Sequence, residues 1–368
     1  MEQTNKTADF YMGANSAKGF YTYYNELEHP KDGWRSYLIK GGAGTGKSSL
    51  MKRIGEECGK NESLIEHLHC SSDPNSLDGI VLHDKKASIV DATPPHVIEP
   101  TYPGGYQSVI NLCEYFDEDK LASRIKKTIE YQTKNNECHR KCCNLLNCAN
   151  ILLQDNYRFV SSQTDFKKIL SLANRIIKKE FKNIHGTKAE EHKRLLSAIT
   201  NQGIKTYSNT PNVLAENIYI IKDIYGVASH TLLSYIREVA LQRNFTIYTC
   251  FCPLNPDSKI EHLFIPELKL GFITQTKFNN FINIKPVSVI SFTRFTNMTA
   301  LRNKKQFLSF NKKAAGELIN EAISVLKYAK SIHDDLERQY TDAVDFDKVA
   351  QKSEEIIAKI KVRNDIHF

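Results

Sequence analysis

Long apolar runs are missing from this sequence, and none approaches the length that a membrane-spanning helix needs. The first residues, M-E-Q-T-N-K, contain no apolar core of a secretion signal. Nine cysteines, an odd number in a chain of 368 residues, do not form the dense framework of a disulfide-stapled secreted domain. We therefore expect no membrane span, reduced thiols and a cytoplasmic location.

The sequence also has no strong excess of one charge, because it contains 50 Lys and Arg residues and 42 Asp and Glu residues, which gives a net charge of +8. So small a surplus only weakly indicates contact with nucleic acid, and a solvated lysine-rich surface explains it more simply. A nucleic-acid partner is therefore not expected. The length exceeds that of one typical hydrophobic core, which predicts two domains.

One glycine-rich stretch, K-G-G-A-G-T-G-K-S-S-L at residues 40–50, has the spacing G-x-x-x-x-G-K-[ST] of a phosphate-binding (Walker A) loop. Glycines let phosphate oxygens approach backbone N–H groups, and a following helix directs its positive end at the same anion. Apolar residues predict a strand at 36–39 and a helix after the loop. The predicted nucleotide-binding residues are Gly41, Gly42, Ala43, Gly44, Thr45, Gly46, Lys47, Ser48 and Ser49.

Within this loop, Lys47 is expected to neutralise the terminal phosphates and Ser48 to offer its hydroxyl to Mg²⁺. Mg²⁺ bound with nucleotide also needs a carboxylate, often at the end of a neighbouring apolar strand, and Asp91 ends the stretch S-I-V at 88–90. A turn or capping aspartate is the alternative. No N-K-x-D or S-G-G-Q signature is present, which favours ATP over GTP and argues against a transport ATPase.

Further polar residues are candidates for chemistry. Asp73 could position water or accept a hydroxyl proton, although an Asx turn before Pro74 fits the sequence equally well. Asp78 is a weaker candidate for the same role. His96, in a proline-rich loop, either touches a substrate or is a surface histidine. The predicted catalytic residues are Lys47, Asp73 and Asp91.

Two other sets of side chains are interpreted as packing residues. An aromatic helix is expected around residues 21–24, and its tyrosines are assigned to the core rather than to base stacking. Four cysteines near His139 have the spacing C-x₃-C-C-x₄-C, which matches no structural zinc site. These cysteines are Cys138, Cys142, Cys143 and Cys148.

The chain also repeats itself. I-I-K at 220–222 repeats L-I-K at 38–40, and the loop and helix that follow match at the same offset of 182. The offset is 184 upstream and 180 downstream, which small insertions and deletions explain. We predict an α/β protein of two tandem domains of the phosphate-loop NTPase type, at residues 1–190 and 191–368, each with mostly parallel strands and a helical tail. In the second copy Asp223, Ala228, Ser229, His230 and Thr274 replace Gly41, Gly46, Lys47, Ser48 and Asp91. This degenerate copy is expected to bind no nucleotide phosphate.

Five stretches carry a resemblance to a known family: K-G-G-A-G-T-G-K-S-S, H-C-S-S-D-P-N-S-L-D-G (69–79), I-V-D-A-T-P-P-H-V-I-E-P-T-Y-P-G (89–104), I-E-H-L-F-I-P-E-L (260–268) and S-I-H-D-D-L-E (331–337). Over nearly its whole length the chain resembles an uncharacterised bacterial family of tandem phosphate-loop ATPases. The resemblance implies ATP binding. Such relatives carry a second glycine loop where this chain has K-D-I-Y-G-V-A-S-H-T (222–231).

The predicted function is Mg²⁺-dependent ATP hydrolysis or phosphoryl transfer at the first domain, with ATP and Mg²⁺ as cofactors. A nucleotide or small-molecule kinase would need an acceptor pocket and a lid, for which residues 93–140 with Arg124 or Arg140 are candidates. An ATP-sensing scaffold with little turnover is the alternative from another class, favoured by the degenerate copy. A nucleic-acid motor has only the net charge in its support. The partner is an unknown acceptor or a protein.

Overall fold

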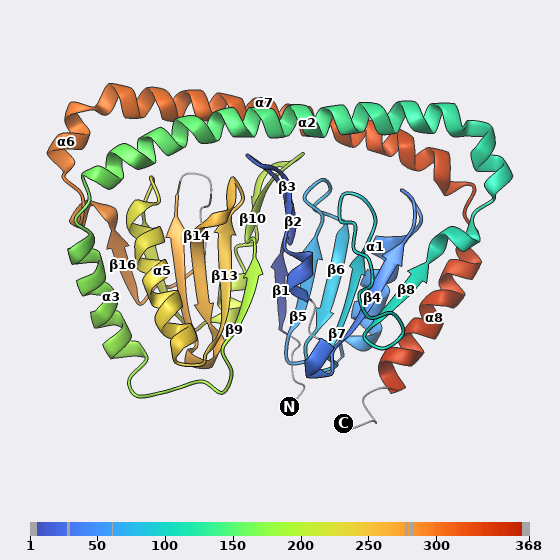
Figure 1. The fold of residues 1–368 in the computed structure, drawn as a ribbon, viewed down its shortest axis with the longest axis horizontal. Helices are drawn as coiled ribbons and strands as arrows, with labels where there is room; N and C mark the ends of the chain where they lie inside the picture. Colours follow the sequence, from blue (N-terminus) through green and yellow to red (C-terminus); the bar gives the residue numbers. More distant parts are fainter. Residues whose placement is uncertain are drawn as a thin grey trace.

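Two six-stranded sheets stand side by side beneath a pair of long helices in the computed structural model (Figure 1). The structure describes residues 6–27, 30–60, 62–276, 279, 281 and 283–362. The prediction of no signal core concerns residues 1–5, which lie outside the described residues. No helix in the described part of the chain is both long and apolar enough to cross a membrane.

The first sheet has the order β1-β5-β6-β7-β4-β8, and its strands run parallel except for β6, which is antiparallel to both neighbours. The prediction of an α/β fold with mostly parallel strands is therefore confirmed. Leu38 and Ile39 of β4 are both buried, as expected for a strand covered on both faces. The elements are β1 (Thr7–Phe10), β4 (Arg35–Lys40), α1 (Lys47–Cys58), β5 (Ile65–His69), β6 (Leu77–Leu82), β7 (Ala87–Asp91) and β8 (Gln107–Asn111).

The second sheet repeats this arrangement with the order β9-β13-β14-β15-β12-β16, and β14 again runs against its neighbours. Each copy also has a two-stranded hairpin beside its sheet. The hairpins are β2 (Gly13–Ser16) with β3 (Gly19–Thr22), and β10 (Ser197–Thr200) with β11 (Gly203–Thr206). The other elements are β9 (Glu190–Arg194), α4 (Thr210–Leu214), β12 (Asn217–Lys222), α5 (Val227–Gln242), β13 (Thr246–Cys252), β14 (Asn255–Ile265), β15 (Leu270–Gln275), β16 (Ser288–Ser291) and α6 (Met298–Asn303).

The long helices α2 (Glu118–Ser162) and α7 (Lys305–Thr341) lie side by side above both sheets (Figure 1). They run antiparallel, since Phe116 bridges Val344 at one end and Thr164 bridges Thr296 at the other. The contact between them is mostly apolar and includes Cys142. Burial raises the pKa of the Cys142 thiol to about 12. The packing interpretation holds for Cys142, whereas Cys148 is exposed.

The helical tails are exchanged between the two copies. α3 (Phe166–Glu180) follows α2 and packs on α5 of the second copy, while α8 (Phe346–Val362) follows α7 and packs on α1 of the first (Figure 1). Val349, Ile356 and Ile360 of α8 lie in one apolar cluster with residues of α1 and of the first sheet. Each copy therefore completes its core with the tail of the other.

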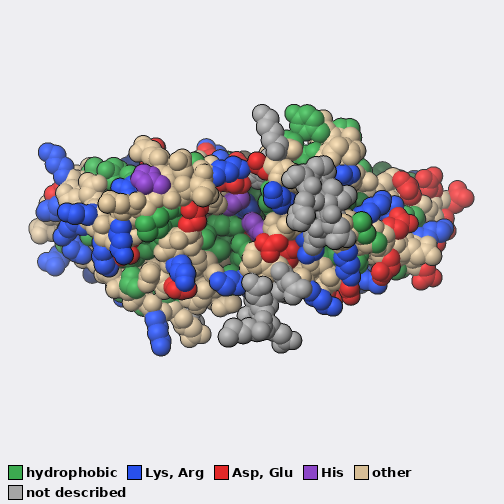
Figure 2. Space-filling model, turned by 90° about the horizontal axis from the view of Figure 1, so that it is seen from below, with side chains coloured by type: hydrophobic (Ala, Val, Ile, Leu, Met, Phe, Trp, Pro, Cys, Tyr) green, Lys and Arg blue, Asp and Glu red, His purple; other side chains and the backbone are tan. Residues whose placement is uncertain are grey.

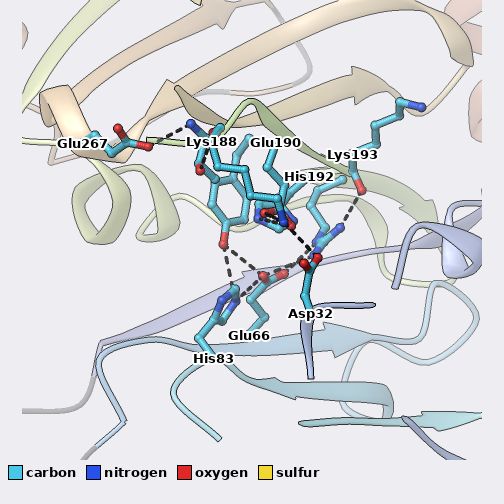
Figure 3. Close-up of polar contacts among 11 residues, drawn as sticks. Asp32, Glu66, His83, Lys188, Glu190, His192, Lys193 and Glu267 are labelled. Atoms are coloured by element: carbon cyan, nitrogen blue, oxygen red, sulfur yellow. Dashed lines mark hydrogen bonds and ion pairs between the residues drawn. The ribbon is translucent and has the colours of Figure 1, made fainter. Parts of the chain in front are cut away.

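The edge strands β1 and β9 bring the two sheets together at the centre of the molecule (Figure 1). Just beyond them, Tyr11 and Leu195 exchange backbone hydrogen bonds of 2.8 and 2.9 Å. Figure 3 shows the polar part of this contact, where Glu66 faces His83, with a distance of 2.7 Å between His83 Nε2 and Glu66 Oε1. Arg194 donates to the same carboxylate from Nε at 2.6 Å. Burial would raise the pKa of Glu66, but Arg194 and His83 hold it well below its usual value.

The predicted aromatic helix at residues 21–24 is wrong. Tyr21 belongs to β3, and a 3₁₀ turn follows at Tyr24–Leu27. The reason is the left-handed Gly19, with φ of 98°, which reverses the chain into a hairpin before the tyrosines. Tyr23 and Tyr24 are nevertheless buried in the core, as the packing interpretation requires.

Figure 2 looks at the molecule from below the view of Figure 1. On this face Lys and Arg side chains predominate at the left end, whereas most Asp and Glu side chains lie toward the right end, with basic residues among them. The interpretation of the net charge as part of a solvated lysine-rich surface stays a prediction.

Candidate functional site

The glycine-rich loop joins the carboxyl end of β4 to the start of α1. Gly44 and Gly46 adopt the left-handed conformation, with φ of 67° and 81°, which glycine adopts without strain. Gly46 caps α1 without a side chain, so the first N–H groups of the helix face the loop. We call residues 41–48 the first loop. Its backbone has the form that an anion-binding helix terminus requires.

Lys47 lies at the centre of the first loop. Its Nζ donates to the carbonyl oxygens of Gly41 at 3.1 Å and Gly42 at 2.7 Å. The same Nζ lies 3.6 Å from Oδ2 of Asp91, the last residue of β7, the strand beside β4. Two neighbouring parallel strands thus bring Lys47 and Asp91 together at one edge of the sheet.

Only one carboxylate oxygen of Asp91, Oδ1, accepts hydrogen bonds from Thr93. Its Oδ1 accepts hydrogen bonds from the backbone N and the hydroxyl of Thr93, at 2.9 and 2.5 Å, whereas Oδ2 faces Lys47. Burial raises the pKa of Asp91 and nearby Asp78 raises it further, while Lys47 lowers it. Ser48 Oγ accepts a hydrogen bond from Leu77 N at 2.9 Å.

Asp73 forms the Asx turn that was the alternative to a chemical role. Its carboxylate accepts from Asn75 N at 3.2 Å and from Ser76 Oγ at 3.3 Å. It also lies 3.4 Å from Nζ of Lys330, which comes from α7 of the second copy. Asp73 therefore shapes the loop after β5 and binds the long helix above it.

His96 is buried rather than a surface histidine. Its Nε2 lies 3.0 Å from Oδ2 of Asp78, and its ring packs against the rings of Phe20 and Tyr24 at 5.0 Å. Burial alone would lower the pKa of His96, but Asp78 and Asp91 raise it above its ordinary value. Its Nδ1 has no hydrogen-bond partner among the described residues.

A cavity of about 1520 Å³ opens above the first loop. All predicted site residues line it, from Gly41 to Ser49 together with Asp73 and Asp91, as do Asp78 and His96. Arg140 lines it too, whereas Arg124 points elsewhere and pairs with Asp342 at 2.6 Å. Of the two arginines proposed for a lid, only Arg140 is therefore placed at the cavity.

Apart from Arg140, the residues of α2 and α7 that line the cavity were missed by reasoning from the sequence. α2 contributes amide side chains such as Asn135 and Asn144, and α7 contributes Glu337 and Tyr340. A Cβ atom on Gly42 would come within 3.0 Å of the Tyr340 ring, so the second copy's helix lies directly against the first loop. The stretch S-I-H-D-D-L-E at 331–337 was the one signal that pointed to this helix.

The equivalent segment of the second copy, residues 223–230, is called the second loop. Gly226, the equivalent of Gly44, has φ of 79° and caps α5, which begins directly after it at Val227. The first loop continues through a second left-handed residue, Gly46, before α1 begins at Lys47, so the two loops start alike but end differently.

The buried carboxylate of Asp223 fills the second loop, accepting from the backbone N of Tyr225, Gly226 and Ser229 at 3.1, 2.9 and 2.9 Å. A Cβ atom on Gly226 would lie 2.4 Å from Cε of Lys259. An internal anion and a lysine thus stand where a phosphate would bind.

Comparisons with protein family models, curated proteins and solved structures give no match for this chain. The resemblance to tandem ATPases and the assignment of ATP and Mg²⁺ therefore stay predictions. Their support comes from the contacts of the first loop and of the cavity above it.

Proposed function

We propose that the protein binds Mg-ATP at the first loop and either hydrolyses it or passes its terminal phosphoryl group to an acceptor. The observation that carries this proposal is the convergence of Lys47, Ser48 and Asp91 on a helix N-terminus formed by left-handed glycines. Free N–H groups and an ammonium bind phosphate oxygens. A hydroxyl and a carboxylate are the oxygen ligands that Mg²⁺ prefers.

The residues of the first loop fit the nucleotide and the ion. Lys47 now donates to two neutral carbonyls, and a phosphate is a stronger acceptor for its charge. Asp91 keeps Oδ2 turned toward Lys47, and Ser48 lies one residue further along α1. Mg²⁺ would neutralise charge on the phosphate oxygens. Lys47 adds to this effect, while the glycine backbone orients the phosphates.

Transfer to a small polar acceptor is favoured over hydrolysis by the size of the cavity. Pockets for single drug-sized ligands measure about 300–1,000 Å³, whereas this cavity measures about 1520 Å³. The space beyond the loop is lined by amides of α2, and the buried pair of His96 and Asp78 lies at its wall.

Lys47→Ala provides the main test. We expect it to remove the rise in melting temperature that Mg-ATP gives the wild type, because nucleotide stabilises only a folded protein that binds it. Lys60→Ala, an exposed lysine just after α1, is the matched control and should keep that rise. A Lys47→Ala protein that keeps the full ligand-induced shift would show that the proposal is wrong.

Product analysis separates hydrolysis from transfer. The wild type is incubated with Mg-ATP alone, with a panel of small hydroxyl compounds and nucleotides, and with RNA or DNA. Phosphate release that no addition changes indicates an ATPase, and a phosphorylated product identified by its mass indicates a kinase. Binding without turnover in every mixture would favour the ATP-sensing scaffold.

A further inference from the structure

A second cluster of polar side chains lies outside the cavity, at the edge of the first sheet. It consists of Asp9 on β1 with His67 and His69 on β5. Asp9 and His67 are direct partners in the parallel pairing of the two strands, and His69, two residues further on, points to the same face. One ligand atom from each residue can be chosen so that all lie within 4.8 Å of one another.

The three side chains of this cluster lie close to one another. Oδ1 of Asp9 lies 2.8 Å from Nε2 of His69 and 3.6 Å from Nδ1 of His67. The side chains of Asp9, His67 and His69 are 29%, 32% and 16% exposed, so an ion can reach them from solvent. Two imidazoles and one carboxylate form a donor set typical of zinc sites that keep one position open.

The hydrogen bonds of His69 decide which ring nitrogen faces Asp9. Nδ1 of His69 lies 3.0 Å from the carbonyl oxygen of Pro74, which can only accept a hydrogen bond, so Nδ1 carries the proton. Nε2 of the same ring faces Asp9 and is therefore the nitrogen available to a metal ion. An ion bound by both atoms at about 2.0–2.1 Å would hold them roughly 3.3 Å apart, so Oδ1 of Asp9 would move outward from its present distance of 2.8 Å. A carbonyl behind the far nitrogen is the arrangement that orients metal-binding histidines.

Contacts from the second copy hold the cluster in place. The hydroxyl of Thr210, at the start of α4, accepts from the backbone N of Asp9 and donates to its carbonyl oxygen, both at 2.9 Å. The ring of Tyr207 stacks on that of His69 with centroids 4.4 Å apart. The backbone of Asp9 and the ring of His69 are therefore positioned by residues of the second copy.

The second sheet shows that the fold does not need this cluster. There Lys193 pairs with Thr249 in the same parallel register, and Phe251 stands two residues further on. Lys193 forms an ion pair of 2.9 Å with Glu26 instead. A lysine, a threonine and a phenylalanine cannot together bind a metal, yet the strands pair in the same way.

We propose that Asp9, His67 and His69 bind one Zn²⁺ ion, with a fourth position open to water. This site is separate from the first loop, and it does not depend on the proposed nucleotide chemistry. It is nevertheless connected to that loop, because Pro74 lies beside Asp73 in the segment that leads to Leu77, the residue that binds Ser48.

The test measures Zn²⁺ without nucleotide. The full chain is stripped with a chelator and titrated with Zn²⁺ by calorimetry, and its metal content is measured after dialysis. We expect one ion per wild-type chain and a loss of affinity of about tenfold or more for Asp9→Asn and for His67→Ala. His185→Ala removes an exposed histidine and is the control that should bind as the wild type does.

Co²⁺ provides a readout that a structural role would not change. Its visible spectrum should indicate tetrahedral coordination in the wild type and change in Asp9→Asn, which keeps the shape of the side chain. Wild-type protein that binds no Zn²⁺, or variants that bind it as well as the wild type, would overturn the proposal. Stronger binding of Fe²⁺ than of Zn²⁺ at the same residues would overturn the assignment of the metal.

Discussion

Replacing Asp223 by alanine tests whether an internal carboxylate fills the second loop. The carboxylate is fully buried and accepts hydrogen bonds from three backbone N–H groups. A buried donor that loses its acceptor costs about 1–3 kcal/mol, but water entering the vacated space recovers part of this. We therefore expect the free energy of unfolding to fall by about 3 kcal/mol, well above the ~0.5 kcal/mol typical of surface substitutions.

The same variant should gain a property that the wild type lacks. Removing the carboxylate leaves three N–H groups at the start of α5 with Lys259 beside them, which is a site for an anion. Inorganic phosphate or sulfate should therefore raise the melting temperature of Asp223→Ala more than that of the wild type. Asp257→Ala, which removes an ion pair with the exposed Lys18 and a hydrogen bond from the hydroxyl of Ser258, should show neither effect.

Urea unfolding gives the stability difference, and thermal unfolding over a range of phosphate concentrations gives the rescue. An Asp223→Ala protein as stable as the wild type would refute the reasoning. A wild type that binds two Mg-ATP per chain, with one remaining in Lys47→Ala, would refute it as well, because the second loop would then accept a phosphate despite Asp223.

Two further substitutions address the first loop and its neighbourhood. Asp91→Asn should weaken the binding of Mg-ATP more than the binding of ATP in EDTA, because it removes a metal ligand but leaves the glycine backbone intact. Calorimetric titration with Mg²⁺ and with EDTA measures both affinities. An equal loss of affinity in both conditions would point to a structural role for Asp91. His96→Gln should destabilise the protein most at acidic pH. The pKa of His96 is raised in the folded state, so the contribution of its charged pair with Asp78 is complete below about pH 6.5 and is lost as the pH rises through the raised pKa. Urea unfolding of both proteins between about pH 5.5 and 8.5 measures the difference, and a constant difference would contradict the assignment.

Local patterns in the sequence predicted the parts of the fold that depend on local contacts. The glycine spacing around Lys47 and the apolar residues before and after it predicted strand, loop and helix, and the repeat predicted a second sheet of the same kind. The substitution of Gly41 by Asp223 indicated an inactive second loop, but only the structure shows the carboxylate inside it. The identity of the domains as phosphate-loop NTPases stays a proposal.

The sequence could not indicate contacts between segments that are far apart in the chain. Lys330 and Tyr340 reach the first loop because α7 crosses from the second copy, and no periodicity shows which loop a helix will cover. His96 looked like a loop histidine because a proline-rich segment gives no sign of burial. The triad of Asp9, His67 and His69 was missed for the same reason, since only strand pairing brings Asp9 to the histidines.

The exchanged tails have a consequence for the origin of this chain. If residues 1–182 were an independent protein, α3 would have no α5 of its own chain to cover, and α1 would lack α8. Two such molecules could each cover the exposed helix of the other with their tail helices, as in a domain-swapped homodimer. The present chain has the form of such a dimer whose subunits have been fused end to end. In a fused chain the two copies need not have the same sequence. The first loop can therefore have glycines and Lys47 while the second loop has Asp223 and Ser229 at two of the equivalent positions.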